Sequence, residues 1–317
     1  MKTKILFNVM LLVLISIGVV SNDAAKVALQ RDTITVFATH GMSSLAGTLV
    51  TEYGKQNPEQ FFEVKSLSLS QFKDAMNDKN SLGFIAQRPD VSMVSEKMWR
   101  ISIGRNVAVT TINTENPFAE NLDKTGISPK KLAEVISGNQ QKTWGAILGN
   151  DQAEPVRFYI LNDPSLKVSV SKFLDITTDA VAAIETKSAG ELIEILKNDK
   201  YAIAFCQLAA ITDINQQAII EHIKLLPLDR NGNERIDYNE NIYGKLTDFE
   251  RAVWIGKYPK VLTSNVYAVA RVFPENENMA DFLSWIVTSG QQFVELNGYT
   301  DLVYSEKKSN LNKLNPT

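Results

Sequence analysis

The sequence predicts an α/β protein, because short apolar runs typical of strands alternate with stretches of helical periodicity. The clearest helix lies within residues 126–138. Ser128 is a typical N-cap, Pro129 fits the first helical position, and Gly138 predicts a left-handed C-terminal stop. The apolar run 107–113 precedes this helix and predicts a strand. Helix and strand in this order are the basis of the fold-class prediction.

The other elements follow the same alternation along the chain. Before the capped helix, strands are predicted at 33–37, 62–67 and 90–94, and helices at 45–56 and 71–77, the second capped by Ser70. After it, strands are predicted at 156–161, 201–205 and 266–270, and helices at 168–174, 190–198 and 281–289, with Ser188 capping the middle one. A length of 317 residues is sufficient for two domains.

The first 25 residues predict a secretory signal. Lys2 and Lys4 precede the apolar run 5–20, and Val19-Val20-Ser21 fits a cleavage site. The run is about 16 residues long, shorter than the roughly 20 that a membrane-spanning helix needs. We therefore expect a cleaved signal peptide and a periplasmic protein, and an uncleaved anchor is the alternative.

Composition limits the function classes. The formal net charge is −3, whereas a nucleic-acid-binding protein usually has a basic excess. Cys206 is the single cysteine and lies in an apolar run, so we expect an inert buried thiol. The two histidines, His40 and His222, are far apart in the sequence and suggest no zinc site.

An enzyme is not expected from the sequence. A hydrolase needs a nucleophile with a positioned base, and the only hint is His40 close to Ser43 and Ser44. No Gly-x-Ser-x-Gly or nucleotide-binding glycine-lysine motif is present. These residues more often form a polar turn than a catalytic pair.

Several motifs occur in an order that resembles the phosphate-binding periplasmic receptors of ABC transporters. Strand 107–113, an Asn116-Pro117 turn, the capped helix and Trp144 form the central part. Residues 39–46 are similar to the family's Gly-x-Ser/Thr-Ser/Thr-x-Ala turn, residues 201–205 to its Ala-Ile-Gly-Tyr strand, and Gly298-Tyr299 with Leu302 to its C-terminal Gly-Tyr-x-x-Leu. The resemblance covers nearly all of the chain after the signal.

The resemblance implies two α/β lobes joined by two crossing strands, with the ligand between them. Residues 26–110 and 263–317 would form the first lobe, and residues 111–262 the second. The ligand would be phosphate or another small oxyanion, and the partner an inner-membrane ABC permease. A monomer without a required cofactor is expected.

Candidate ligand contacts lie where helices begin. The first lobe offers Thr39, Gly41, Ser43, Ser44 and, after the 90–94 strand, Ser95. Backbone N–H groups at a helix N-terminus and serine hydroxyls can both donate to an anion, although Ser43 or Ser44 can instead simply cap its helix.

The second lobe departs from the family pattern. The family's Arg-x-x-x-Ser-Gly-Thr grips phosphate, but here Asp163 falls near the arginine position, and Lys167, Val168 and Ser169 replace the turn. Lys167 and Ser169 are the candidate contacts, although lysine lacks the arginine fork. The departure leaves an alternative, in which the same fold serves as an envelope accessory or signalling protein that binds a protein partner.

Residues 229–240 resemble an EF-hand calcium loop. The oxygen ligands would come from Asp229, Asn231, Asn233, the carbonyl of Arg235 and the carboxylate of Glu240. Glu234 stands at the sixth position, where the pattern has a glycine with positive φ. A structural calcium ion is therefore one interpretation of the loop, and a solvated surface turn is the other.

Overall fold

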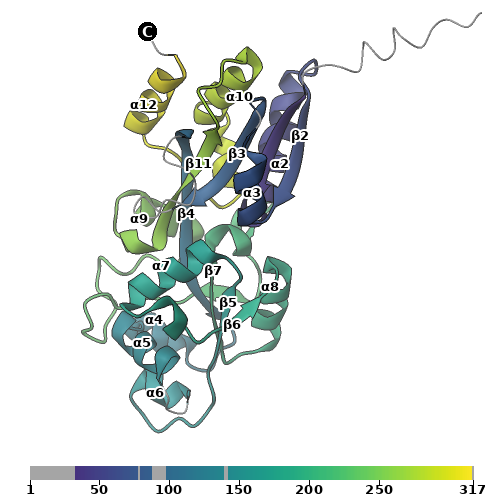
Figure 1. The fold of residues 1–317 in the computed structure, drawn as a ribbon. Helices are drawn as coiled ribbons and strands as arrows, with labels where there is room; N and C mark the ends of the chain where they lie inside the picture. Colours follow the sequence, from purple (N-terminus) through teal and green to yellow (C-terminus); the bar gives the residue numbers. More distant parts are fainter. Residues whose placement is uncertain (1–32, 78, 88–97, 139–141, 316–317) are drawn as a thin grey trace, which may run out of the picture.

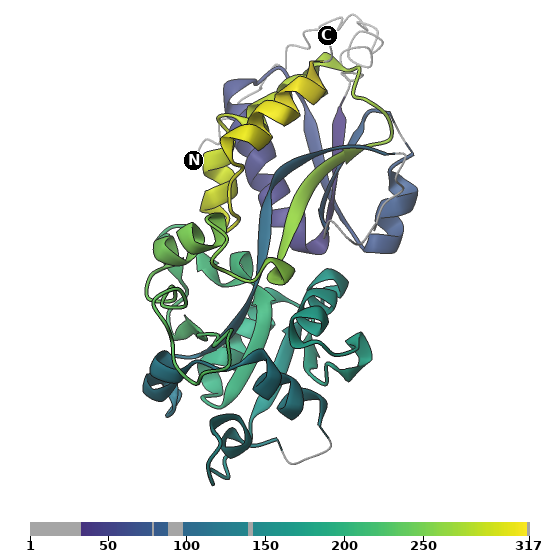
Figure 2. The ribbon, with the colours of Figure 1, turned by 90° about the vertical axis from the view of Figure 1, so that its left-hand side faces the viewer.

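Two hydrophobic cores divide the chain into two lobes (Figures 1 and 2). The computed structural model describes residues 33–77, 79–87, 98–138 and 142–315. The predicted signal peptide, the strand at 90–94 and Ser95 lie outside the described residues. The core of the first lobe draws on both ends of this chain, and the core of the second lobe draws on the middle of it.

The first lobe is the upper part of Figure 1. Its strands are β1 (Ile34–Thr39), β2 (Phe62–Leu67), β3 (Ser81–Gln87) and β11 (Thr263–Ala270). Its helices are α2 (Ser43–Gln56), α3 (Leu69–Ala75), α10 (Glu277–Val287), α11 (Gln291–Leu296) and α12 (Tyr304–Leu314), with a short 3₁₀ turn η1 (His40–Met42) before α2. Buried Leu45, Leu49 and Tyr53 form the apolar stripe of α2 at four-residue spacing.

The second lobe contains the elements from α4 to α9. Its helices are α4 (Ala119–Thr125), α5 (Pro129–Ser137), α6 (Trp144–Leu148), α7 (Pro164–Leu174), α8 (Ala189–Asn198) and α9 (Leu246–Trp254). Its strands are β5 (Arg157–Leu161), β6 (Ile184–Thr186), β7 (Ala202–Gln207), β8 (Thr212–Asp213), β9 (Ala218–Ile219) and β10 (Ile223–Leu225), and its 3₁₀ turns are η2 (Thr178–Ala180), η3 (Leu208–Ile211) and η4 (Lys260–Leu262).

One long strand, β4 (Trp99–Asn113), runs through both lobes (Figure 2). Its first part pairs antiparallel with β11, and its second part pairs antiparallel with β7 and β10. The main path of the sheet therefore runs β2-β1-β3-β11-β4-β7-β5-β6 across the whole molecule. Within it, β1 is parallel to β2 and β3, and β5 is parallel to β6 and β7.

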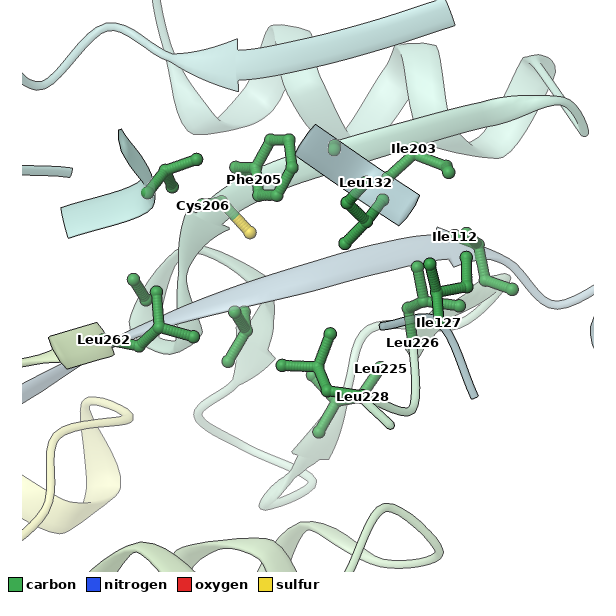
Figure 3. Close-up of a cluster of buried hydrophobic side chains, with 14 of the residues drawn as sticks. Ile112, Ile127, Leu132, Ile203, Phe205, Cys206, Leu225, Leu226, Leu228 and Leu262 are labelled. Carbon is green, nitrogen blue, oxygen red and sulfur yellow. The ribbon is translucent and has the colours of Figure 1, made fainter. Parts of the chain in front are cut away.

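The second core explains two features of the sequence (Figure 3). Trp144 is fully buried, and its indole N–H donates to the carbonyl of Tyr201. Cys206 points into the same core, and burial raises the pKa of its thiol to about 12. The thiol is therefore protonated at neutral pH and unreactive.

Several sequence predictions differ from the structure at the ends of elements. Ser128 caps α5 through a bond from the Lys131 N–H, but Gly138 has φ −72° and an extended backbone, so the predicted left-handed stop is wrong. Ser68, not Ser70, caps α3. The helix predicted from residue 168 begins earlier, at Pro164.

None of the helices in the described ranges is both long and apolar enough to span a bilayer.

Candidate interlobe site

The lobes meet where a parallel strand of each one ends. Strand β1 leads into α2, and strand β5 leads into α7, so the N-termini of both helices lie at carboxyl edges of the sheet. Ligands of open α/β sheets bind at such edges. A Cβ atom placed on Gly41 would lie 3.6 Å from Oδ2 of Asp163, which shows how closely the two edges approach.

Asp163 occupies the N-terminus of α7. Its Oδ1 accepts the Ser165 N–H at 2.7 Å, the Leu166 N–H at 3.1 Å and the Ser165 hydroxyl at 2.6 Å. Its Oδ2 accepts the side-chain N–H of the buried Gln207 at 2.8 Å. The carboxylate therefore accepts the backbone N–H groups that a bound oxyanion would use in a receptor of this fold.

Tyr299 joins the C-terminal segment of the first lobe to this site. Its hydroxyl donates to the carbonyl of Gly41 at 2.9 Å, and its ring is buried. Burial and the nearby Asp163 carboxylate raise the pKa of Tyr299, so the phenol keeps its proton and acts as a donor.

Gly298 allows this segment to approach the second lobe. It has φ +78°, and a Cβ atom there would lie 2.7 Å from Cα of Ala209 in η3. Only glycine combines this backbone conformation with so close a contact. The Gly298-Tyr299 pair, noted in the sequence only as a C-terminal motif, lies at the lobe boundary.

The hydroxyl groups predicted on α2 have partners within the first lobe. Ser43 donates to Ser66 at 2.7 Å and to the carbonyl of Thr39 at 3.3 Å. Ser44 donates to the side chain of Asn297 at 3.4 Å. Neither caps the helix, because the N-cap residue is Met42 and has no side-chain hydrogen bond. The first N–H groups of α2 thus have no side-chain cap.

The contacts predicted on α7 point to partners in the second lobe. Lys167 forms an ion pair with Glu185 at 2.8 Å, and both line a cavity of about 210 Å³ with Asp163. Ser169 is buried, and its hydroxyl donates to the carbonyl of Ser165 within the helix. The structure therefore places Gly41 next to α7, whereas Lys167 and Ser169 are engaged in bonds within their own lobe.

Sequence reasoning assigned no role to Asp163, Gln207 or Tyr299. A signal for the first was present, because Asp163-Pro164 has the same cap-then-proline form as Ser128-Pro129. Gln207 carries no local signal, since it ends an apolar strand and reaches Asp163 only through the fold.

The 229–240 loop is folded around two buried carboxylates. Asp229 accepts the N–H groups of Gly232, Asn233 and Glu234, at 2.8, 3.3 and 2.8 Å. Glu240 accepts the Arg230 N–H at 2.8 Å. Glu234, at the sixth loop position, has φ +59°, the conformation for which the calcium pattern uses glycine.

The side chains of this loop are arranged around Asp237. Asn231 and Asn233 each donate a side-chain N–H to its Oδ2, at 2.9 and 3.1 Å. Within the described residues, no three acidic, histidine or cysteine side chains converge as a metal cluster, and this loop is included. A calcium ion would therefore need the two asparagine amides to turn their oxygens inward, since Asp229 and Glu240 are the two buried acids here.

Comparison of the sequence with protein families and with curated proteins gives no match. Comparison of the fold with solved structures gives many. A protein described as a phosphate ABC transporter substrate-binding protein with bound phosphate, from Clostridium perfringens, has a TM-score of 0.64 and 12% identity over 86% of this chain and 100% of that one. An ABC-type phosphate transport receptor from Vibrio cholerae has a TM-score of 0.59 and 12% identity over 85% and 100%.

The chain therefore has the two-lobed fold of type 2 periplasmic binding proteins, as predicted. The same fold occurs outside transport. Full-length BenM has a TM-score of 0.51 and 10% identity over 89% of this chain and 75% of that one, and LysR regulatory domains share the fold. At these identities the comparisons establish the fold and leave the ligand to the site itself.

Proposed function

We propose that this chain is an exported binding protein of the phosphate-receptor fold whose interlobe oxyanion site is occupied by its own Asp163. In this proposal it acts through a protein partner in the cell envelope and does not deliver phosphate to a permease. The observation that carries the proposal is the Asp163 carboxylate, which accepts the α7 N–H groups and lies beside Gly41.

Electrostatics support this reading of the site. An oxyanion entering between Gly41 and α7 would meet a carboxylate, and repulsion between two anions in a partly dry site is strong. Lys167 is paired with Glu185, so its charge is already compensated. A substitution that keeps the helix cap but removes the charge should therefore open the site to an anion.

Calorimetric titration of inorganic phosphate into the mature chain tests the proposal. We expect no saturable binding to the wild-type protein below millimolar phosphate, and saturable binding to Asp163→Ser, because serine also caps a helix N-terminus. Asp151→Ser, which removes an exposed carboxylate elsewhere, is the charge-matched control. Micromolar binding by the wild-type chain would overturn the proposal.

A second candidate function is an oxyanion receptor that serves an ABC permease. The α2 N-terminus favours it, because Met42 provides no side-chain cap and anions are stabilised at such helix ends. The same titration separates the two, and phosphate uptake by cells lacking the chain adds an independent measurement. Unchanged uptake supports the accessory role, whereas lost uptake supports the receptor.

We also propose that the chain is exported and that its 229–240 loop holds a structural calcium ion. Export rests on the signal-like residues 1–25, and mass spectrometry of the mature N-terminus in a periplasmic fraction tests it. Calcium rests on buried Asp229 and Glu240 and on the positive φ of Glu234. The ion would be bound by Asp229, Asn231, Asn233, the Arg235 carbonyl and Glu240, and would hold the loop in shape.

A further inference from the structure

A cavity of about 390 Å³ lies at the boundary between the lobes, separate from the Asp163 contact. Helix α9 of the second lobe provides one wall, which includes Glu250, Arg251 and Trp254. The end of α11 and the segment after it provide the other, which includes Glu295, Thr300 and Asp301. Each lobe therefore contributes acidic side chains to the same space.

The charge of this lining is unbalanced. Three carboxylates face the cavity with one guanidinium, and Asp301 also pairs with Lys307 of α12 at 3.2 Å. Glu250 is half-buried and, among the described residues, forms no hydrogen bond or ion pair. Burial, and then repulsion from Glu295, raise the pKa of Glu250 to about 7.

Glu295 is affected by the same surroundings. Burial and the Asp301 carboxylate raise its pKa, and Lys307 opposes this shift. A carboxylate in this position is stabilised by a positive charge that enters the cavity, because no side chain in the described part of the chain compensates Glu250.

Thr300 provides an independent indication of a ligand. It is 5% exposed and lines the cavity, and its Oγ1 has no hydrogen-bond partner among the described residues. Its backbone N–H and C=O are both bonded to Arg105, at 3.0 and 2.8 Å, so the residue is fixed in place. A buried hydroxyl left without a partner destabilises the fold unless something enters to bond it.

We propose that this cavity binds a small aliphatic amine in its ammonium form. An ammonium group has three N–H donors, which match the carboxylates of Glu250 and Glu295 and the hydroxyl of Thr300 as acceptors. Trp254 is 51% exposed and lines the same cavity, so its ring offers an apolar surface to the alkyl chain and a π face to the cation.

Titration of the mature chain with 1,5-diaminopentane at pH 8 tests this inference, followed by calorimetry and by tryptophan fluorescence. The neutral 1,5-pentanediol, which has the same chain length, is the matched ligand. We expect saturable 1:1 binding of the diamine with a change in Trp254 emission, and no binding of the diol. Equal binding of both ligands, or binding of neither, would overturn the proposal.

Two variants locate the site. Glu250→Gln and Thr300→Val should each weaken diamine binding by about tenfold or more, because each removes an acceptor for the ammonium group. Glu277→Gln, an exposed glutamate on α10, should bind as the wild-type chain does. If Glu250→Gln does not fold, Thr300→Val still decides, because it removes only an unpartnered hydroxyl; wild-type affinity in the folded variants contradicts the proposal.

Binding should also weaken as the pH falls from 8 to 5.5, since Glu250 takes up a proton and no longer attracts a cation. The charged groups that face it are Arg251 on its own helix, Glu295 on α11 and Asp301 with Lys307. Phosphate and Asp163 take no part in this assay, so its outcome and the outcome of the phosphate titration are independent.

Discussion

Two carboxylates at the boundary between the lobes, Asp163 and Glu250, have opposite surroundings. Asp163 accepts four hydrogen bonds, three of them from the start of α7 and one from Gln207. Glu250 has no partner in the described part of the chain and lies near another acid, Glu295. A buried charge that is fully bonded stabilises a structure, and one that is unpaired weakens it.

The comparison shows how one fold can close one site and leave another open. The site that a phosphate receptor would use already contains an anion of the protein itself, whereas the cavity beside α9 has acceptors in excess of donors. We therefore expect Asp163 to hold the structure together without a solute, and Glu250 to depend on pH and on what enters the cavity.

Asp163→Ala should produce the largest loss of stability. It removes the α7 cap and leaves the buried side chain of Gln207 without its acceptor, and together these effects should lower the free energy of unfolding by about 3 kcal/mol. Urea denaturation measures the loss. Asp163→Ser keeps the cap and should lose about half as much; equal losses for both variants would show that the bond to Gln207 carries the effect alone.

Gly298→Ala should be the next most harmful change, with a loss of about 2 to 3 kcal/mol, since it adds backbone strain to a contact of 2.7 Å with Ala209. Gly256→Ala is the matched control, because Gly256 has φ +77° with nothing within 4 Å of the added Cβ. Thermal denaturation of the pair separates strain from contact. Similar melting temperatures would show that the lobes do not press on each other at this point.

Much of the fold was predictable because local patterns agree with tertiary packing. The β2 strand lies at 62–67 as predicted, and the caps Ser128 and Ser188 are confirmed. The strand predicted at 107–113 is only the second half of β4, because the first half, with Arg100, Gly104 and Arg105, does not form an apolar run. Pairing with β11 extends that strand, and pairing is not visible in a local window.

The candidate site was harder to predict for a physical reason. Gly41 and the serines beside it were recognised because a helix start has a local signature. Their partner across the boundary, Asp163, was noted only as a departure from a family pattern. Its contact with Gly41 depends on how two lobes approach each other, and no spacing in the sequence encodes that approach.

Calcium should stabilise the chain by a smaller amount, through a carboxylate that resembles Asp163 in its bonding. Asp229 also accepts three backbone N–H groups, and an ion at ten times its dissociation constant would add about 1.4 kcal/mol. The melting temperature should therefore rise with added calcium chloride and not with magnesium chloride.

Glu240→Gln should abolish that rise, because it removes one of the two buried acids of the loop. Glu234→Gly provides the opposite test, since glycine adopts φ +59° without strain and should strengthen binding. A melting temperature that is independent of calcium in all three proteins would identify the loop as a bonded surface turn.

The smallest effect should be the pH dependence caused by Glu250. Its pKa in the folded chain, about 7, lies above the value of about 4.5 in the unfolded chain, so the folded state binds the proton more tightly. Stability from this group is therefore full below pH 4.5 and is lost as the pH rises towards 7. Because the side chain is only half-buried, the loss should stay below about 1 kcal/mol.

Urea denaturation at pH 5 and pH 8 measures this loss, and Glu250→Gln should reduce it, because glutamine stays neutral throughout. Glu277→Gln should retain the wild-type difference. Saturating 1,5-diaminopentane at pH 8 should restore stability to the wild-type chain and not to Glu250→Gln. If the wild-type and Glu250→Gln curves change equally with pH, the contrast between Asp163 and Glu250 is wrong, and the acids of the cavity are already compensated.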